Sequence, residues 1–261
     1  MAGMPAALVT GASTGLGREF ARICAREGYD VFLVARSRPH LEALSAEIEA
    51  TFKRRTVVIA QDLATPDAGQ IVFDTVQNSG MPLEILINNA GFGLVGRCWE
   101  LDANKQIEML HVNVLALTEL TRLFLPGFIA QRKGRIMNIA STAAFQPGPL
   151  MAVYFATKAY VVSFSEAVHN EAREFGVSVT CVCPGPTKTE FADRAGMGNS
   201  RLFKSGRTMD ARDVAEQGYS AMKSGKALLI PGRMNAAMAF MARMAPLQLT
   251  ASVARRLQES A

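Results

Sequence analysis

Few residues in this 261-residue sequence are suited to hold a metal ion or to build a disulfide framework. The three histidines, His40, His111 and His169, have no metal-ligand spacing, so we expect no metal site. The four cysteines are scattered, which excludes a disulfide scaffold. Cys181 and Cys183 alternate along an apolar run, so we expect both thiols on one face of a strand, as buried structural groups and not as a redox pair.

Targeting and membrane segments are lacking as well. The N-terminus reaches strand-like sequence within a few residues and shows no signal peptide. No segment approaches the roughly 18 apolar residues of a membrane span. The formal charge is +5, but no run of five lysines and arginines occurs, which favours a scattered basic surface over a nucleic-acid face. We therefore expect a cytoplasmic protein with no integral membrane segment and no nucleic-acid partner, whose basic excess suits an anionic small molecule.

The composition, 49% hydrophobic and 20% charged, is that of a globular protein long enough for one large α/β domain. We find no internal repeat or second-domain boundary, so we expect a single domain over residues 1–261. Short apolar runs alternate with helical patterns, which predicts a parallel sheet with helices on both faces. The expected strands are 6–9, 31–36, 56–60, 84–87, 135–141, 177–183 and 227–231.

The first apolar run ends in a glycine-rich turn, Thr10-Gly11-Ala12-Ser13-Thr14-Gly15-Leu16-Gly17, and a helical pattern follows it. Glycines let the backbone come close to a cofactor phosphate, and the helix N-terminus offers free N–H groups and a positive dipole end. The spacing GxxxGxG differs from the common GxGxxG fingerprint, and a simple tight turn would look the same. This turn alone is therefore weak evidence for a nucleotide site.

Tyr154 and Lys158 lie four residues apart in a helical pattern that ends at Gly176, so their side chains share one face. An ammonium at roughly 4 Å from a phenol favours the phenolate and lowers a pKa of about 10 by ~2–3 units. We therefore expect a phenol that donates or accepts a proton near neutral pH. This spacing also occurs by chance on many helices, so its meaning depends on the rest of the chain.

Taken together, the motifs resemble those of the short-chain dehydrogenase/reductase family in order and spacing, over roughly residues 5–231. The matching residues are Thr10-Gly11-x-x-x-Gly15-x-Gly17, Asn88-Asn89-Ala90-Gly91, Asn113, Ser141, Tyr154-x-x-x-Lys158 and Pro184-Gly185. The resemblance implies one Rossmann-type domain whose seven-stranded parallel sheet has the order 3-2-1-4-5-6-7. It also implies a nicotinamide cofactor.

The same resemblance implies a catalytic set of four residues. Tyr154 is the expected general acid when a carbonyl is reduced, and the base in the reverse direction. Lys158 is expected to lower the Tyr154 pKa and to bind the nicotinamide ribose, while Ser141 holds the substrate oxygen. Asn113 is expected to carry a water that links Lys158 to solvent. The residues expected at the cofactor are Gly11, Ser13, Thr14, Gly15, Leu16, Gly17, Arg36, Asp62, Leu63, Asn89, Ala90, Gly91, Tyr154, Lys158, Pro184, Gly185 and Thr187.

The end of the second strand indicates which cofactor is preferred. A carboxylate there would accept hydrogen bonds from the adenosine ribose and repel a 2′-phosphate, but this chain has Ala35. Arg36 follows and can hold a phosphate through paired charge-assisted hydrogen bonds. Arg38 is close enough in sequence to add positive charge near that phosphate, and Thr14 could supply a hydroxyl to it. We predict NADP(H) as the preferred cofactor, with NAD(H) as the alternative.

The substrate is expected to be a small, apolar ketone or aldehyde, or the matching alcohol. Ser141, Phe145, Tyr154 and Phe191 are the expected contacts, with residues 188–209 as a substrate loop. Other apolar residues near the strand ends fit a pocket or ordinary loop packing equally well. They are Phe92, Leu94, Leu150, Met151, Met197 and Phe203. Acyl-chain, steroid and xenobiotic ketones all remain open.

Residues 233–261 are expected to form a helical tail, because Met234, Met238 and Met241 recur at helical spacing. We favour packing of this tail against the body or a partner subunit over contact with a membrane surface. The resemblance also implies a homodimer or homotetramer that pairs through the helices at 104–125 and 154–175.

Two other functions fit parts of the sequence. A non-catalytic protein that binds a nicotinamide nucleotide would keep the glycine turn, but the intact Ser141, Tyr154 and Lys158 argue against it. A sugar-nucleotide epimerase or dehydratase shares the tyrosine–lysine pair. It would need a larger C-terminal substrate domain than the residues after Pro186 provide.

Overall fold

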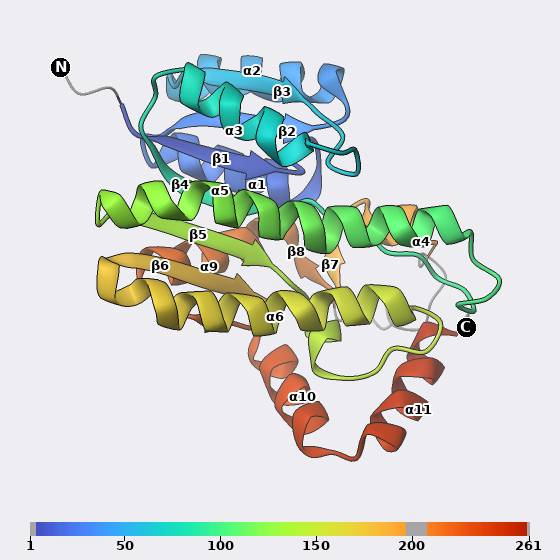
Figure 1. Cartoon of the computed structure of the whole chain (residues 1–261). Coiled ribbons are helices and arrows are strands. Elements are labelled where there is room, and N and C mark those ends of the chain that lie inside the picture. Colours follow the sequence, from blue (N-terminus) through green and yellow to red (C-terminus); the bar gives the residue numbers. More distant parts are fainter. Residues whose placement is uncertain (1–3, 197–207, 260–261) are drawn as a thin grey trace.

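The computed structural model describes residues 4–196 and 208–259. Residues 197–207, which include Met197 and Phe203 of the expected substrate loop, lie outside the described residues. Seven strands form one parallel sheet in the order β3-β2-β1-β4-β5-β6-β9 (Figure 1). The strands are β1 (Ala6–Thr10), β2 (Asp30–Ala35), β3 (Thr56–Ala60), β4 (Leu83–Asn88), β5 (Gly134–Ile139), β6 (Val177–Val182) and β9 (Leu228–Leu229).

This order confirms the prediction of 3-2-1-4-5-6-7, with β9 as the seventh strand. The numbering skips two positions because β7 (Thr187–Lys188) and β8 (Met209–Asp210) pair with each other in a separate two-stranded sheet. That pairing joins the two ends of the expected substrate loop. The segment from 187 to 210 is therefore anchored where it leaves and re-enters the body.

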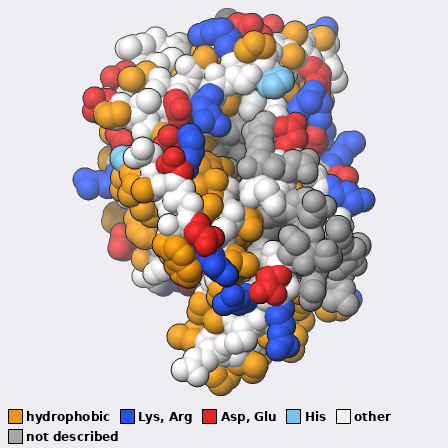
Figure 2. Space-filling view, turned by 90° about the vertical axis from the view of Figure 1, so that its right-hand side faces the viewer, with side chains coloured by type: hydrophobic (Ala, Val, Ile, Leu, Met, Phe, Trp, Pro, Cys, Tyr) orange, Lys and Arg blue, Asp and Glu red, His pale blue; other side chains and the backbone are white. Residues whose placement is uncertain are grey.

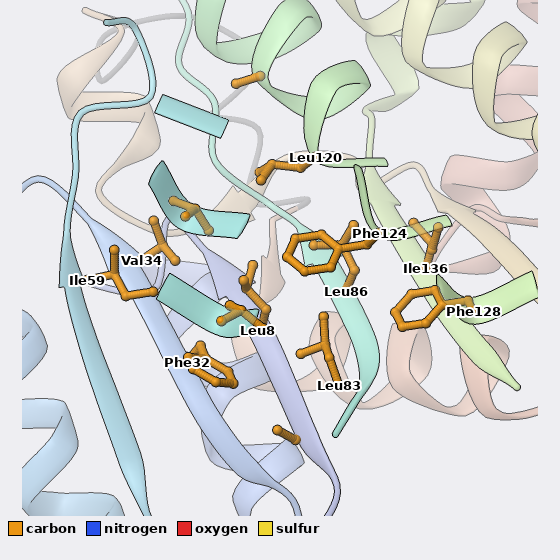
Figure 3. Packing of buried hydrophobic residues seen from close by; sticks show 14 of the residues in the cluster. Leu8, Phe32, Val34, Ile59, Leu83, Leu86, Leu120, Phe124, Phe128 and Ile136 are labelled. Carbon is orange, nitrogen blue, oxygen red and sulfur yellow. The ribbon is translucent and has the colours of Figure 1, made fainter. Parts of the chain in front are cut away.

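Helices cover both faces of the sheet. The helices α1 (Gly15–Arg26), α2 (Arg38–Phe52) and α9 (Ala211–Lys223) pack on one face, and α3 (Ala68–Asn78), α5 (Leu117–Ala130) and α6 (Ala152–Ala172) on the other. Side chains of a strand alternate between faces, so Ala7 and Val9 meet α1 while Leu8 joins the other core. Figure 3 shows Leu8, Phe32 and Leu86 in that second core beneath Phe124 of α5.

One long helix continues past a proline, a residue that normally interrupts a helix. It runs through α4 (Ala103–Leu110), the π-helical η1 (His111–Ala116) and α5, and Pro126 does not end it. The buried Phe124 and Phe128 on either side of the proline pack into the core, and tertiary packing of this kind outweighs local propensity. By length and composition Ala103–Ala130 is able to cross a membrane, so our expectation that no segment reaches that size is wrong. Its buried side chains nevertheless pack on the sheet as those of a core helix do.

Several of the remaining elements lie near the carboxyl-terminal edge of the sheet, whereas η3 lies at its opposite edge, directly before β6. Ser141 caps the short helix η2 (Thr142–Phe145), which leads into α6, and α6 ends through η3 (Arg173–Phe175) at Gly176. Asp210 caps α9, because its carboxylate accepts a hydrogen bond from the Arg212 N–H. The short helix α7 (Phe191–Arg194) follows β7, and α10 (Arg233–Met244) and α11 (Leu247–Gln258) form a V that projects from the body (Figure 1).

Candidate active site

A cavity of about 970 Å³ lies along the carboxyl-terminal edge of the sheet. Its walls come from the turn after β1, the ends of β2, β4, β5 and β6, the start of α6, and one side of α10 and α11. Parallel α/β sheets bind their ligands at this edge, as expected. The predicted residues that line it are Gly11, Ser13, Thr14, Gly15, Leu16, Arg36, Asp62, Leu63, Asn89, Ala90, Gly91, Ser141, Tyr154, Lys158, Pro184, Gly185, Thr187 and Phe191.

The glycine turn is held against the end of β4 by a small hydrogen-bond network. Asn89 Nδ2 donates to the carbonyl oxygens of Thr10 (2.9 Å) and Gly11 (3.3 Å), and Thr10 Oγ1 accepts from the Asn89 and Ala90 N–H groups. Gly11 has φ +66°, and a Cβ on it would lie 2.8 Å from Asn89 Nδ2. Only glycine fits this close approach, which explains the pairing of TG with NNAG in the sequence.

Gly17 lies outside the cavity lining and has a packing role. A Cβ on Gly17 would lie 2.2 Å from the carbonyl oxygen of Gly11, so the residue lets α1 start directly against the turn. The Thr14 side chain caps no N–H group of α1. The backbone N–H groups of the first turn therefore remain able to bind a phosphate.

The nucleotide end of the cavity lies at the end of β2. Ala35 and Arg36 line it together with Ser37 and His40, which sequence reasoning missed. The His40 ring is held by a 3.0 Å hydrogen bond between Ser37 Oγ and His40 Nδ1. Arg38 is not among the lining residues, because its guanidinium faces Glu42 across 3.7 Å at the surface.

Tyr154, Ser141 and Lys158 meet at the middle of the cavity. Ser141 Oγ accepts a hydrogen bond from the Ala143 N–H (3.1 Å), donates to the Pro184 carbonyl oxygen (3.4 Å) and lies close enough to the Tyr154 hydroxyl to influence its pKa. Lys158 is 4% exposed, and its Nζ donates to the Ile139 carbonyl oxygen at 2.9 Å. The same Nζ lies 5.7 Å from the centroid of the Tyr154 ring. The helix α6 and the end of β5 thus bring together the side chains expected to do the chemistry.

Burial controls how these groups titrate. It raises the pKa of Tyr154 to about 12, while the hydrogen bond with Ser141 acts in the opposite direction. It lowers the pKa of Lys158 to about 8, against the influence of Cys181 and Cys183. Our expectation that Lys158 lowers the Tyr154 pKa does not hold in this arrangement, because desolvation dominates and the ammonium bonds to Ile139. The phenol is therefore protonated at neutral pH.

The two cysteines lie behind Lys158 as free thiols. Cys181 and Cys183 are both buried, with their sulfur atoms 3.9 Å apart on one face of the chain at the end of β6. The pKa of Cys183 is raised well above its ordinary value by its hydrogen bond with Cys181 and by burial. This arrangement agrees with the expected structural role, because Cys183 stays a neutral thiol.

Asn113 lies in the π-helical segment η1 and does not line the cavity. Its Oδ1 accepts from the Phe92 N–H (3.0 Å), and its Nδ2 donates to the Phe92 carbonyl oxygen (3.0 Å) and to Thr157 Oγ1 (3.1 Å). The side chain thereby ties the loop after β4 to α6. Both amide hydrogens are engaged, so the side chain has no free donor for a water. The water-carrying role of Asn113 stays a prediction.

The substrate end of the cavity is apolar. The Phe191 ring of α7 lies 5.5 Å from the Tyr154 ring, and Met151 and Leu94 join them in one hydrophobic cluster. Phe145 is not among the lining residues: it is buried in a different cluster, and the Arg243 guanidinium lies 5.7 Å from its ring centroid. The structure therefore brings Phe191, but not Phe145, to the expected substrate position.

A family model described as short chain dehydrogenase matches residues 5–199 of the chain. The chain belongs to the short-chain dehydrogenase family. Among curated proteins, it is 36% identical over 192 residues to the very-long-chain 3-oxoacyl-CoA reductase of Homo sapiens, and 35% identical to that of Bos taurus. These matches cover 71% of this chain, which spans about 60% of the length of those relatives.

Solved structures are similar to this chain over a larger share of its length. A short-chain dehydrogenase from Sphingobium yanoikuyae in complex with NADPH is 30% identical, with a TM-score of 0.84 over 98% of both chains. A bulky-bulky ketone specific alcohol dehydrogenase from Comamonas testosteroni is 27% identical, with a TM-score of 0.78 over 92% of both chains.

In this short-chain dehydrogenase, sequence reasoning missed the part of the site that α10 and α11 provide. Both helices lie after residue 199, where the family match ends. Their inner sides line the cavity, and many of their apolar side chains, including some that line it, are exposed to solvent. Figure 2 shows these hydrophobic side chains at the lower end of the molecule. The helical spacing of methionines predicted the helix but not the direction in which it points.

Proposed function

We propose that the protein interconverts a ketone or aldehyde and the corresponding alcohol, with NADP(H) as its preferred redox cofactor. The observation that carries the proposal is the meeting of Tyr154, Ser141 and Lys158 inside one cavity with the glycine turn. The names of relatives support this reaction class, since they describe a 3-oxoacyl-CoA reductase and a ketone-specific alcohol dehydrogenase.

The residues at the glycine turn fit a dinucleotide. Gly11 and Gly15 have no side chains, so a ligand is able to approach the backbone of the glycine turn closely. The first turn of helix α1 then offers its backbone N–H groups to a pyrophosphate. Asp62 and Leu63 line the cavity between this turn and β3, and Asn89, Ala90 and Gly91 lie on the other side. A bound nicotinamide cofactor would supply or accept the hydride, which no side chain of the protein is able to do.

The side chains would manage the proton and the charge on oxygen. In carbonyl reduction, the protonated Tyr154 phenol donates its proton to the substrate oxygen. Ser141 Oγ holds that oxygen and stabilises the negative charge that develops on it. Lys158 keeps its positive charge at pH 7, because its pKa is about 8, and it would help to hold the nicotinamide ribose of a bound cofactor. In alcohol oxidation the same groups act in reverse.

Arg36 supports the preference for NADP(H). Arg36 is an exposed residue that lines the nucleotide end beside Ala35, and it makes no ion pair with any described residue. A 2′-phosphate at this place would meet a cation and no carboxylate on β2. Structural relatives were solved with NADPH and with NAD, so the preference rests on Ala35 and Arg36 of this chain.

The test is cofactor oxidation with a panel of ketones and aldehydes, on wild type and on Tyr154→Phe. The variant lacks the proton donor, so its kcat should fall by ~10²–10⁴ while its Kd for NADPH changes little. Tyr160→Phe is the matched control, because Tyr160 is on the same helix but its hydroxyl bonds with Thr118 at the surface. Near-normal turnover by Tyr154→Phe would refute the assignment. Tight NADPH binding by wild type without turnover on the whole panel would favour the non-catalytic alternative.

A further inference from the structure

The inner side of α11 presents two adjacent rows of side chains to the cavity. Residues four apart in a helix share one face, and six residues of α11 at this spacing line the cavity. The rows are Leu249, Val253, Leu257 and Thr250, Ala254, Gln258. Met238 and Met241 of α10 line the same cavity. The two helices therefore form a wall that is apolar over most of its length and belongs to the cavity that contains Tyr154. The wall is open to solvent on one side, where Leu249 is 58% exposed and Val253 49% exposed.

Gln258 is the exception to this apolar character. It is 6% exposed, and its Oε1 atom is buried with no hydrogen-bond partner among the described residues. Thr250, the other polar residue of its row, is satisfied, because its hydroxyl donates to the Leu247 carbonyl oxygen at 3.0 Å. A buried acceptor without a partner is costly, so buried polar atoms of this kind are normally paired. An acceptor that lines a cavity is able to obtain its donor from a ligand.

We propose that the α10–α11 wall is a second subsite, which holds the apolar body of the carbonyl substrate, and that Gln258 accepts a hydrogen bond from that body. The donor is a hydroxyl or an amide N–H placed away from the reacting carbonyl. This inference rests on the proposed function, since the substrate is the molecule that reaches both Tyr154 and the wall. It narrows the substrate class to extended apolar carbonyl compounds that carry one hydrogen-bond donor away from the reacting carbonyl.

The wall is tested by binding that needs no turnover. A series of methyl ketones of increasing chain length is titrated by calorimetry into the full-length Tyr154→Phe protein loaded with NADP⁺. Each added methylene that reaches the wall should tighten Kd by up to about fourfold. Val253→Asp should remove this gain. Ser252→Asp is the matched control, because Ser252 is the equally exposed neighbour that does not line the cavity. A Kd independent of chain length, or equally affected by both variants, would overturn the subsite.

Gln258 is tested with three ketones of equal length that end in a methyl group, a hydroxyl or an N-methyl amide. Wild type should bind the hydroxyl or the amide compound about 2- to 12-fold more tightly than Gln258→Met does, while the methyl compound loses nothing. The compound with the larger loss identifies the donor. Equal affinities of wild type and Gln258→Met for all three compounds would refute the role of Gln258. Calorimetry measures binding without turnover, so a failure of the turnover assay would leave the subsite proposal standing. Turnover together with a Kd that does not depend on chain length would refute the subsite and leave the proposed reaction standing.

Discussion

At the scale of single residues, the buried Lys158 lowers the stability of the fold, although the proposed chemistry needs it. Burial lowers its pKa from 10.5 to about 8, so the folded state disfavours the charged form that the unfolded chain carries. This difference corresponds to about 3 kcal/mol at neutral pH. The penalty is fully present below pH 8 and disappears as the pH rises through 10.5, because only the unfolded state binds the extra proton in that window.

We therefore predict that Lys158→Met stabilises the protein while it removes activity. At pH 7 the free energy of unfolding should rise by about 1–3 kcal/mol, reduced from the full penalty by the lost hydrogen bond to Ile139. The gain should vanish near pH 10.5. Urea unfolding at the two pH values measures it. Lys226→Met, at an exposed site, is the control and should change stability by less than about 0.5 kcal/mol. A destabilised Lys158→Met at pH 7 would show that the lysine is paired more favourably than its burial indicates.

The cofactor preference is the second prediction at this scale. Ala35→Asp combined with Arg36→Ala should shift the ratio of kcat/KM for NADPH over NADH by roughly 10- to 150-fold toward NADH, the usual worth of one charge-assisted contact. Arg38→Ala is the control and should change the ratio by less than about threefold, because Arg38 faces Glu42 and not the cavity. A wild-type enzyme that already prefers NADH would contradict the assignment of Arg36.

At the scale of elements, α5 allows a prediction about helix propensity. Gly127 lies in its interior at an exposed position, and a Cβ there would meet nothing within 4 Å. Gly127→Ala should raise stability by about 0.5–1 kcal/mol, and Tm by roughly 1–4 °C. Gly218→Ala in α9 is the matched control, since its Cβ would lie 3.3 Å from two ring carbons of the buried Phe20. Thermal unfolding compares them, and an equal gain at both sites would show that packing around Phe20 is not tight.

Elements also show where sequence reasoning succeeds. The strands were predictable because each is an apolar run bounded by turns, and the sheet order follows from the family resemblance. The continuity of α5 through Pro126 was not, since Pro126 is a local break that the burial of Phe124 and Phe128 outweighs. The glycine turn and the Tyr154–Lys158 pair were found because their residues are close in sequence. The wall from α10 and α11 depends on how two helices after the last strand fold back, and nothing local in their sequence determines this direction.

At the scale of the whole molecule, one exposed apolar surface indicates how copies of the chain would assemble. It lies on α4, η1 and α6, where Ile107 is 53% exposed and Leu115 52% exposed. Tyr160 of α6 joins this surface, and its hydroxyl bonds with Thr118 of α5 at 2.9 Å, which fixes the two helices side by side. Exposed apolar side chains on adjacent helices are suited to pair with the same surface of a second copy.

We therefore predict a dimer or tetramer that pairs through this surface, and a shift to monomer in Leu115→Glu. In a two-fold interface, a glutamate near the axis faces the same glutamate of the second copy. The repulsion between the two carboxylates adds to the cost of removing them from water. Light scattering at micromolar concentration measures the mass. Ile71→Glu is the matched control, because Ile71 is also exposed and apolar but lies on α3. A monomeric wild type would contradict the prediction outright. An oligomer that survives Leu115→Glu would move the interface elsewhere, and the exposed tip of α10 and α11, with Phe240 and Met244, would be the next surface to test.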